Sequence, residues 1–184
     1  MMKYYKTIID DSDFVLTDRD SMHRMVDAIY PKPQQKVWYT HNGIIHIRSF
    51  EKFKGGSYRD DVSVISITEH SIPEVGDEFM FSLHFSPSVC RSRPGKKSVD
   101  KYPSNFEFAD NFIKTRLDDS GMTGTCDVTY VGHEHVKLPY DIPIFRCDGY
   151  ATVTDSDQFA KVMMDGIKGC NLKSRGLGII EIDR

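Results

Sequence analysis

The chain has 184 residues, of which 39% are hydrophobic and 28% are charged, and its formal net charge is −3 at pH 7. This composition is typical of an ordinary soluble globular protein, and the length allows one domain or two small ones. The negative net charge argues mildly against a generic nucleic-acid binder, although the distribution of charge matters more than its sum. No signal peptide and no apolar run of spanning length occurs, so we expect a cytoplasmic protein that does not enter a membrane.

The N-terminal part of the sequence predicts a strand followed by an amphipathic helix. Residues 3–10 alternate in polarity with a period of two, which is typical of a strand. Residues 21–30 carry apolar side chains at helical spacing. These side chains are Met22, Met25, Val26 and Ile29. Asp20 is the expected N-cap of this helix and Pro31 the expected stop.

His23 is placed by this pattern in the first turn of the helix, beside the apolar stripe. The unpaired N–H groups and the helix dipole disfavour a positive imidazolium there, while Asp20 and Asp27 oppose that effect. A histidine that stays near neutral at physiological pH can accept or donate a proton. His23 is therefore a candidate general acid or base. The alternative is a histidine that merely lies on the surface of a helix.

The middle of the sequence predicts strands that lead into a basic loop. Residues 36–41 and 44–50 flank Asn42-Gly43 and predict a hairpin with a two-residue turn. Residues 62–67 and 79–85 predict two further strands. The loop that follows, CRSRPGKKSVDK, has one acid and five cations, which are Arg91, Arg93, Lys96, Lys97 and Lys101. Such a loop can contact phosphates, and the alternative is an ordinary solvated basic loop.

A helix and a bent strand are predicted next. Residues 103–117 favour a helix with Phe108, Phe112 and Leu117 buried. Residues 126–143 favour a strand with a bend. His133 and His135 would share one face of that strand, as metal ligands can, but the sequence identifies no third ligand and we expect no metal site.

The C-terminal stretch predicts a strand at residues 145–153, a helix that starts at Thr154 and ends near Gly166, and a last strand at residues 177–182. Between the helix and the last strand lies GIKGCNLKSRGLG. This segment has four glycines, no acid and three cations, Lys168, Lys173 and Arg175. Glycine lets backbone N–H groups approach a ligand, and cations favour phosphate. The alternative is a flexible surface loop.

The order of the predicted elements indicates an α+β protein. Strand–helix–strand–strand–strand is followed by helix–strand–strand–helix–strand, which suggests two α+β units side by side. The expected boundary lies near Pro94 to Pro103, which gives domains at residues 1–95 and 96–184.

Two separated stretches resemble the CasE family, the CRISPR repeat-processing endoribonucleases of type I-E systems. The first is DSMHRMVDAIYP, and the second is FRCDGYATVTDSDQFAKVMMDGIKGCNLKSRGLGIIEI. The middle stretch FMFSLHFSPSVCRSRPGKK is also similar. The order and spacing fit over nearly the whole chain, while residues 32–75 and 103–144 match only in outline. The tail motif is fairly specific, whereas the histidine helix alone would not be.

The resemblance implies two ferredoxin-like (RRM-like) domains in tandem, with antiparallel sheets and helices packed on one face. It implies binding of a CRISPR repeat RNA hairpin and one cut at its 3′ base without a metal or other cofactor, so that 2′,3′-cyclic phosphate and 5′-OH ends result. It also implies that the protein stays with its product among the other subunits of a type I-E surveillance complex.

His23 matches the family's catalytic histidine, and residues 166–178 match its C-terminal glycine-rich loop beside the RNA. The expected RNA contacts are Arg24, Arg91, Arg93, Lys96, Lys97, Lys168, Lys173, Arg175 and Gly176.

One position departs from the family pattern. A tyrosine commonly stands three residues before the histidine, where this chain has Asp20. A carboxylate cannot donate a hydrogen bond to a phosphate, so Ser21, Tyr30 or a nearby lysine would have to replace the donor. A second hypothesis is therefore a homologue that binds RNA without cutting it, as a structural subunit or a decoy. A third is an unrelated ferredoxin-like protein with a small-molecule site.

Overall fold

The computed structural model describes residues 2–10, 19–30, 36–41, 44–53, 63–93, 96–135, 141–170 and 176–183. At residues 10, 20, 41, 63, 89–93, 96–101 and 183 it describes the backbone alone.

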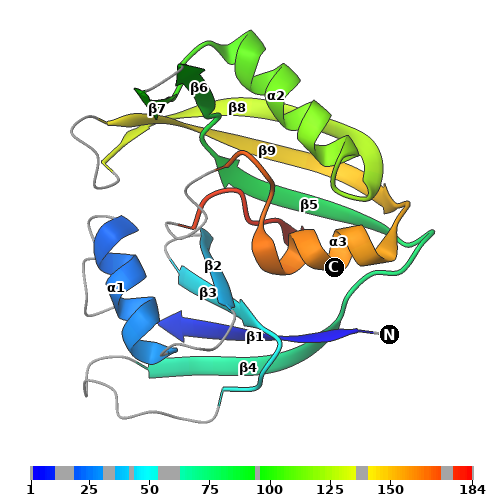
Figure 1. The fold of residues 1–184 in the computed structure, drawn as a ribbon. Coiled ribbons are helices and arrows are strands. Elements are labelled where there is room, and N and C mark those ends of the chain that lie inside the picture. Colours follow the sequence, from blue (N-terminus) through cyan, green and yellow to red (C-terminus); the bar gives the residue numbers. More distant parts are fainter. Residues whose placement is uncertain are drawn as a thin grey trace.

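The first unit of the fold is a four-stranded antiparallel sheet with one helix (Figure 1). Its elements are β1 (Lys3–Asp10), α1 (Arg19–Ile29), β2 (Lys36–His41), β3 (Ile44–Ser49) and β4 (Ser63–Ser71). The strands lie in the order β2-β3-β1-β4, so the first strand is inserted between the third and the fourth. That permutation is typical of the ferredoxin-like fold.

The second unit repeats this permutation, in the order β10-β5-β9-β8. Its elements are β5 (Glu78–Phe85), α2 (Phe106–Asp118), β8 (Met122–Glu134), β9 (Ile142–Val153), α3 (Ser156–Asp165) and β10 (Glu181–Asp183). A hairpin of β6 (Val89–Arg93) and β7 (Lys96–Lys101) is inserted between β5 and α2 and forms a small sheet of its own. The predicted α+β fold of two ferredoxin-like units is confirmed.

The chain leaves the first sheet and enters the second earlier than the sequence indicated. Sequence analysis placed the boundary between residues 95 and 96. The strand β5 pairs with β9 and β10 rather than with any strand of the first sheet. The chain therefore passes from one sheet to the other in residues 72–77. The clear alternation of β5 predicted a strand, but alternation carries no information on which sheet a strand joins.

The helix α1 packs on the first sheet through the stripe that the sequence predicted. Val26 and Ile29 are buried, and Met22 and Met25 are partly buried against the same cluster. The helix begins at Arg19, so Asp20 lies inside the first turn and the prediction that it is the N-cap was wrong. His23 consequently lies two residues further into the helix than expected, beyond the first turn, where the dipole effect has faded.

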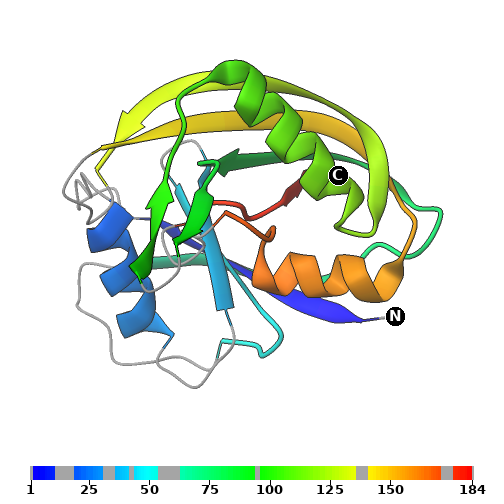
Figure 2. The ribbon, with the colours of Figure 1, turned by 45° about the horizontal axis from the view of Figure 1, so that its top comes forward.

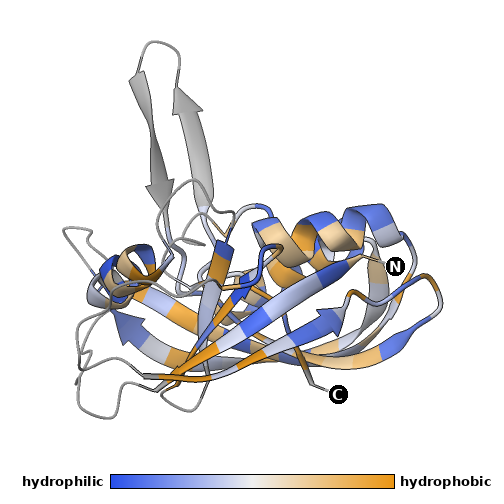
Figure 3. Ribbon diagram, turned by 90° about the horizontal axis from the view of Figure 1, so that it is seen from below, coloured by the Kyte–Doolittle hydropathy of each residue, from blue (hydrophilic) through white to orange (hydrophobic). Residues whose placement is uncertain are grey.

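The helices α2 and α3 cover the same face of the second sheet, as Figure 2 shows. On β5, Phe79 packs against Phe159 of α3, and Phe85 stacks on Phe112 of α2. Phe79 and Phe85 are an even number of residues apart, so they point to one face of the strand. Figure 3 shows the resulting alternation of hydrophobic and hydrophilic residues along the strands.

The ends of these helices differ in detail from the predictions. Asp155, not Thr154, caps α3, because its side chain accepts a hydrogen bond from the backbone N–H of Gln158. Gly166 ends α3 with a φ of 77°, as predicted. Phe108 was expected to be buried but is 37% exposed, because α2 turns Ala109, Ile113 and Leu117 to the core.

The two units are joined by a buried arginine, Arg48 of β3, which is 2% exposed. Its guanidinium donates to the backbone oxygens of Met163 and Ile180 at 2.7 and 2.5 Å, both in the second unit. It also lies 5.1 Å from the ring centroid of Tyr4 and 5.8 Å from that of Tyr39. Arg48 therefore supplies donors to the carbonyl at the end of α3 and to the carbonyl that precedes β10.

A second polar contact reinforces this junction. Lys6 of β1 lies 3.7 Å from Glu181 of β10, whose residue is only 6% exposed. Ser82 of β5 donates to the same carboxylate at 3.5 Å. Burial is the main cause that raises the pKa of the nearby Tyr39 phenol, so this side chain stays neutral in the interface.

We expect Arg48→Met to lower the free energy of unfolding by about 3 kcal/mol, because two buried carbonyl oxygens lose their donor at about 1–3 kcal/mol each. Chemical denaturation measures the loss. The control is Arg24→Met, which removes an exposed arginine from α1 and should change stability by no more than about 0.5 kcal/mol. Equal stability of the two variants would show that Arg48 does not hold the units together.

Candidate nucleic-acid interface

The N-terminal end of α1 is fixed to the second unit. Arg19 is 6% exposed and forms an ion pair with Glu134 at the end of β8, including a contact of 3.3 Å from Nη2 to Oε1. Since Arg19 precedes His23 by four residues, about one helical turn, this ion pair sets where His23 lies relative to the second sheet.

His23 belongs to a small charged network on α1 and β2. Its side chain is 28% exposed, and its Nε2 lies 3.5 Å from Oδ2 of Asp27, one turn along the helix. The other oxygen of Asp27 lies 2.9 Å from Nζ of Lys36, which also donates to the backbone oxygen of Tyr30. This arrangement gives the imidazole a fixed partner on one side while part of the ring stays accessible, which suits a group that exchanges a proton with a substrate.

Tyr30 cannot replace the missing tyrosine as a donor to substrate. Its side chain is fully buried, and its hydroxyl shares a hydrogen bond of 2.6 Å with the hydroxyl of Thr7. Burial also raises the pKa of this phenol. Ser21 accepts a hydrogen bond of 3.3 Å from Arg24, and the Lys36 side chain is only 9% exposed. Ser21 is thus the predicted substitute that stays partly exposed on α1.

The glycine-rich segment, residues 166–178, folds back onto the second unit at both ends. The backbone N–H of Ile167 donates to the oxygen of Gly178 at 2.8 Å, and the N–H of Gly178 donates to the oxygen of His84 at 2.7 Å. The N–H of Gly178 is therefore already used inside the fold.

Gly176 has a packing role against the first unit. Its φ is 73°, and a Cβ added there would lie 2.9 Å from Cζ3 of Trp38. Trp38 of β2 is 2% exposed and shares a buried cluster with Val26 and Ile29 of α1. The segment from the C-terminal unit and the helix that carries His23 thus meet through one tryptophan.

The predicted cations fall into three groups. Arg24 is exposed on α1, and Lys168 is exposed in the turn after α3. Lys173 and Arg175 lie outside the described residues. The other four belong to the β6–β7 hairpin, Arg91 and Arg93 to β6 and Lys96 and Lys97 to β7.

The prediction of a basic loop was wrong, because this segment forms two paired strands. Arg91 pairs with Val99 and Arg93 with Lys96, in an antiparallel register with an irregularity between the two arginines. The segment was missed as a strand pair because its polar sequence lacks the alternation that marks a strand. These four predicted contacts therefore lie on paired strands instead of in a loop.

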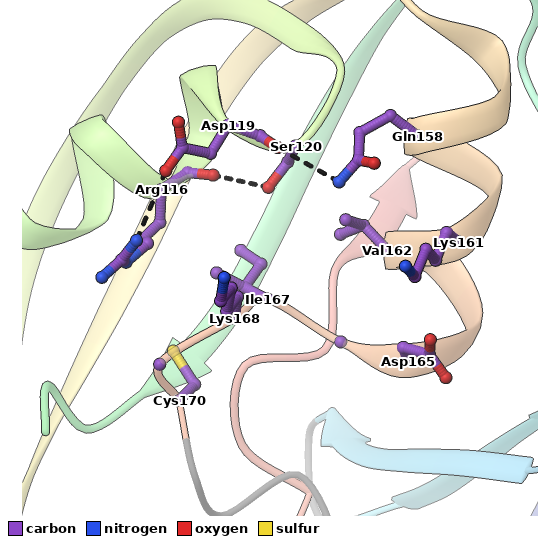
Figure 4. Close-up of a pocket in the computed structure, with 12 residues that line it drawn as sticks. Arg116, Asp119, Ser120, Gln158, Lys161, Val162, Asp165, Ile167, Lys168 and Cys170 are labelled. Atoms are coloured by element: carbon purple, nitrogen blue, oxygen red, sulfur yellow. Dashed lines mark hydrogen bonds and ion pairs between the residues drawn. The ribbon is translucent and has the colours of Figure 1, made fainter. Parts of the chain in front are cut away.

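Arg116 of α2 and Lys161 of α3 are functional candidates that sequence reasoning missed. With Lys168 they line a groove between the two helices (Figure 4). The available signal was weak, namely an arginine four residues after Phe112 and eight after Phe108, on one face of the predicted helix.

His133 and His135 are engaged separately. The Tyr130 hydroxyl lies 2.5 Å from Nδ1 of His133, and Nδ1 of His135 lies 3.2 Å from Asp141. Within the described ranges, no group of three or more His, Cys, Asp or Glu side chains is arranged to hold a metal ion. In the part of the chain that the structure describes, no helix is long and apolar enough to cross a membrane.

Solved structures that are similar to this chain include CRISPR-associated proteins. The chain is similar to Thermus thermophilus Cse3 bound to an RNA that represents a pre-cleavage complex, with a TM-score of 0.79 at 13% identity over 100% of both chains. It is similar to Cas6e from Escherichia coli str. K-12, with a TM-score of 0.69 at 14% identity over 98% of both chains. A chain of a CRISPR RNA-guided surveillance complex matches with a TM-score of 0.60 at 15% identity, over 97% of this chain and 98% of the other.

No protein-family model and no curated protein matches the sequence. At these identities the structural likeness establishes the fold and not the activity. The chain has the same fold, over nearly its whole length, as the CRISPR endoribonuclease Cse3 and as Cas6e.

We expect Gly176→Ala to destabilise the protein more than Gly76→Ala does. Both glycines have a positive φ, but a Cβ at Gly76 would meet nothing within 4 Å. The backbone strain costs about 1 kcal/mol at either site. The contact with Trp38 adds about 1–3 kcal/mol at Gly176 alone. Denaturant unfolding of the two variants measures the difference, and equal losses would contradict the packing role.

The stability of the protein should fall in weak acid because of His84. Burial first, and then the charges of Arg19 and Arg146, lower the pKa of this side chain in the folded state. The unfolded chain has the ordinary value of about 6.5 and takes up the proton first, so unfolding becomes easier as the pH falls below that value. Denaturant titrations at several pH values from about 7.5 to about 5, which span the ordinary histidine pKa, measure the slope of stability against pH. His84→Gln should flatten it, and an unchanged slope would contradict this role for His84.

Proposed function

We propose that this protein is a metal-independent endoribonuclease of the CasE type, which binds a CRISPR repeat RNA hairpin and cuts once at its 3′ base. The observation that carries the proposal is the meeting of α1, with His23, and the glycine-rich segment at Trp38. Two stretches far apart in the sequence carry the family resemblance, and the fold packs both against the same residue. Among the chains with the same fold, Cse3 has been solved bound to RNA.

The chemistry needs a proton acceptor, a proton donor and a bound phosphate. The 2′-oxygen of the RNA attacks the adjacent phosphorus, its proton passes to a base, and the bond from phosphorus to the 5′-oxygen breaks as that oxygen takes up a proton. The products are a 2′,3′-cyclic phosphate and a 5′-OH. His23 acts as the general base or acid in this step. When its Nε2 carries the proton and faces Asp27, its Nδ1 is the nitrogen that accepts.

Charge on the phosphate is balanced by cations rather than by a metal in this proposal. Arg24 follows His23 in the chain and is exposed on α1. Arg91, Arg93, Lys96 and Lys97 of the β6–β7 hairpin contact the phosphates of the stem, which fits the recognition of double-stranded RNA through shape, phosphates and 2′-OH groups. In-line geometry comes from the position of the bound RNA.

The proposal extends to the setting of the protein. One chain with this fold belongs to a CRISPR RNA-guided surveillance complex. We place this protein in the cytoplasm as a subunit that keeps its product RNA and contacts the other subunits of a type I-E complex.

A second candidate is an RNA-binding module that does not cut. Asp20 favours it, because this carboxylate stands where the family commonly has a tyrosine, and the buried Tyr30 cannot replace that hydroxyl. This candidate predicts the same RNA affinity and the same contacts as the nuclease, so only a cleavage assay separates the two.

The test is cleavage of the repeat hairpin from the source genome in the presence of EDTA. Wild type should produce a single cut with a cyclic-phosphate end. His23→Ala should slow cutting by about 100-fold or more while binding persists, because the proton acceptor is lost. His70→Ala, which removes a histidine from β4, is the matched control and should cut like wild type.

Three results would each contradict a part of this proposal. Equal cutting by wild type and His23→Ala would remove His23 from the chemistry. Tight binding without cutting by either protein would leave the binding module. Failure of wild type to bind the hairpin at physiological salt would exclude both candidates.

A further inference from the structure

A groove of about 580 Å³ lies between the C-terminal end of α2 and one side of α3, and it is closed at one end by the turn after α3 (Figure 4). Arg116 stands on the α2 wall, Lys161 and Asp165 stand on the α3 wall, and Lys168 stands at the closed end. We call this hollow the α2–α3 groove. Nothing in the proposed cleavage chemistry uses it.

The groove carries more positive than negative side chains. Its cations are Arg116, Lys161 and Lys168, and its acids are Asp119 and Asp165. Arg116 contacts Asp119 at 3.3 Å, with side chains 33% and 64% exposed, so the ion pair is solvated and weak and leaves the guanidinium open to a ligand. The charge suits a phosphate that enters from solvent.

An aromatic row continues from the groove along α2. Phe108, Phe112 and Arg116 follow at intervals of four residues on one side of the helix. The rings of Phe108 and Phe112 stack with centroids 6.2 Å apart, and the guanidinium of Arg116 lies 5.5 Å from the centroid of Phe112. Phe108 is 37% exposed and Phe106, at the start of the helix, is 51% exposed. The chain thus leaves aromatic surface in water beside a row of cations.

This row lies next to the proposed RNA site. A Cβ at Gly169 would lie 3.1 Å from Phe112 and 3.3 Å from Nε of Arg116, so the glycine-rich segment touches the row directly. Ser88, the residue before β6, donates to the backbone oxygen of Gly169 at 2.5 Å. The base of the basic hairpin, the glycine-rich segment and the α2–α3 groove therefore join at one point.

We propose that the α2–α3 groove and its aromatic row bind the unpaired RNA that continues from the hairpin on its 5′ side. Exposed rings stack on bases that are free of a partner, and neighbouring cations hold the phosphates between them, which is how proteins bind single strands. The bases of a duplex are already stacked and cannot use the rings. The inference rests on the proposed function, because a cut at the 3′ base leaves the 5′ side as the unpaired strand of the product.

The experiment compares two product RNAs, the repeat hairpin with its unpaired 5′ segment and the same hairpin without it. Arg116→Gln with Lys161→Gln should weaken binding of the extended RNA and lower its salt slope by about 1.4, since each lost single-strand phosphate contact contributes about 0.7. Phe108→Ala should weaken binding of the same RNA at least about fivefold, which is the lower limit for the loss of one stacked base. Neither variant should change binding of the bare hairpin.

Lys114→Gln is the matched control. Lys114 lies on α2 between Phe112 and Arg116 in sequence, but it pairs with Asp110 at 2.8 Å and does not line the α2–α3 groove. It should bind both RNAs like wild type. If the double variant bound both RNAs equally more weakly than wild type, it would indicate contact with the stem and overturn the inference. Unchanged binding of both RNAs would overturn it as well. Failure of wild type to bind the bare hairpin would instead overturn the proposed function itself, and the inference with it.

Discussion

The arrangement of the candidate site depends on a single buried guanidinium. Arg48 comes from β3 of the first unit, and its two backbone acceptors come from α3 and from the residue before β10. A buried cation requires hydrogen-bond partners in a defined geometry, because burial without them is strongly unfavourable. The requirement fixes the first sheet against the end of the glycine-rich segment. Lys6 with Glu181, and Trp38 with Gly176, add contacts across the same junction.

This junction explains how segments far apart in the sequence come to pack together. His23 lies on a helix of the first unit, while the glycine-rich segment ends the second. The ion pair of Arg19 with Glu134 connects the start of that helix to β8. The strands β8 and β10 form opposite edges of the second sheet. The first unit, which carries His23, is therefore held to the second unit at two places, the Arg48 junction and this ion pair. In the proposed function, such rigidity positions the RNA, and positioning is the main source of the in-line geometry.

Patterns that belong to one element could be predicted from the sequence. The spacing of Met22, Val26 and Ile29 predicted α1, and the alternation around Phe81 predicted β5. The Asn42-Gly43 pair predicted a hairpin, and β2 and β3 pair in that register, although the turn lies outside the described residues.

Features that depend on contacts between distant elements could not be predicted. The sequence gives no sign that Phe108 faces water, because three phenylalanines offer α2 more apolar positions than one face can bury. The roles of Gly176 and Gly178 follow from Trp38 and His84, which lie far away in the chain. The membership of β5 in the second sheet and the position of Arg116 in the α2–α3 groove also depend on contacts between distant elements.

The measurement that tests the central claim most directly concerns the RNA and leaves the protein unchanged. A repeat hairpin with a single 2′-deoxy nucleotide on the 5′ side of the scissile phosphate lacks the attacking oxygen and keeps every other contact. The account predicts that wild-type protein binds this RNA like the unmodified hairpin and does not cut it, while it cuts the unmodified hairpin to a cyclic-phosphate end. Cutting of the deoxy-substituted RNA at the same bond would show that water or another group attacks, and would contradict the chemistry assigned to His23.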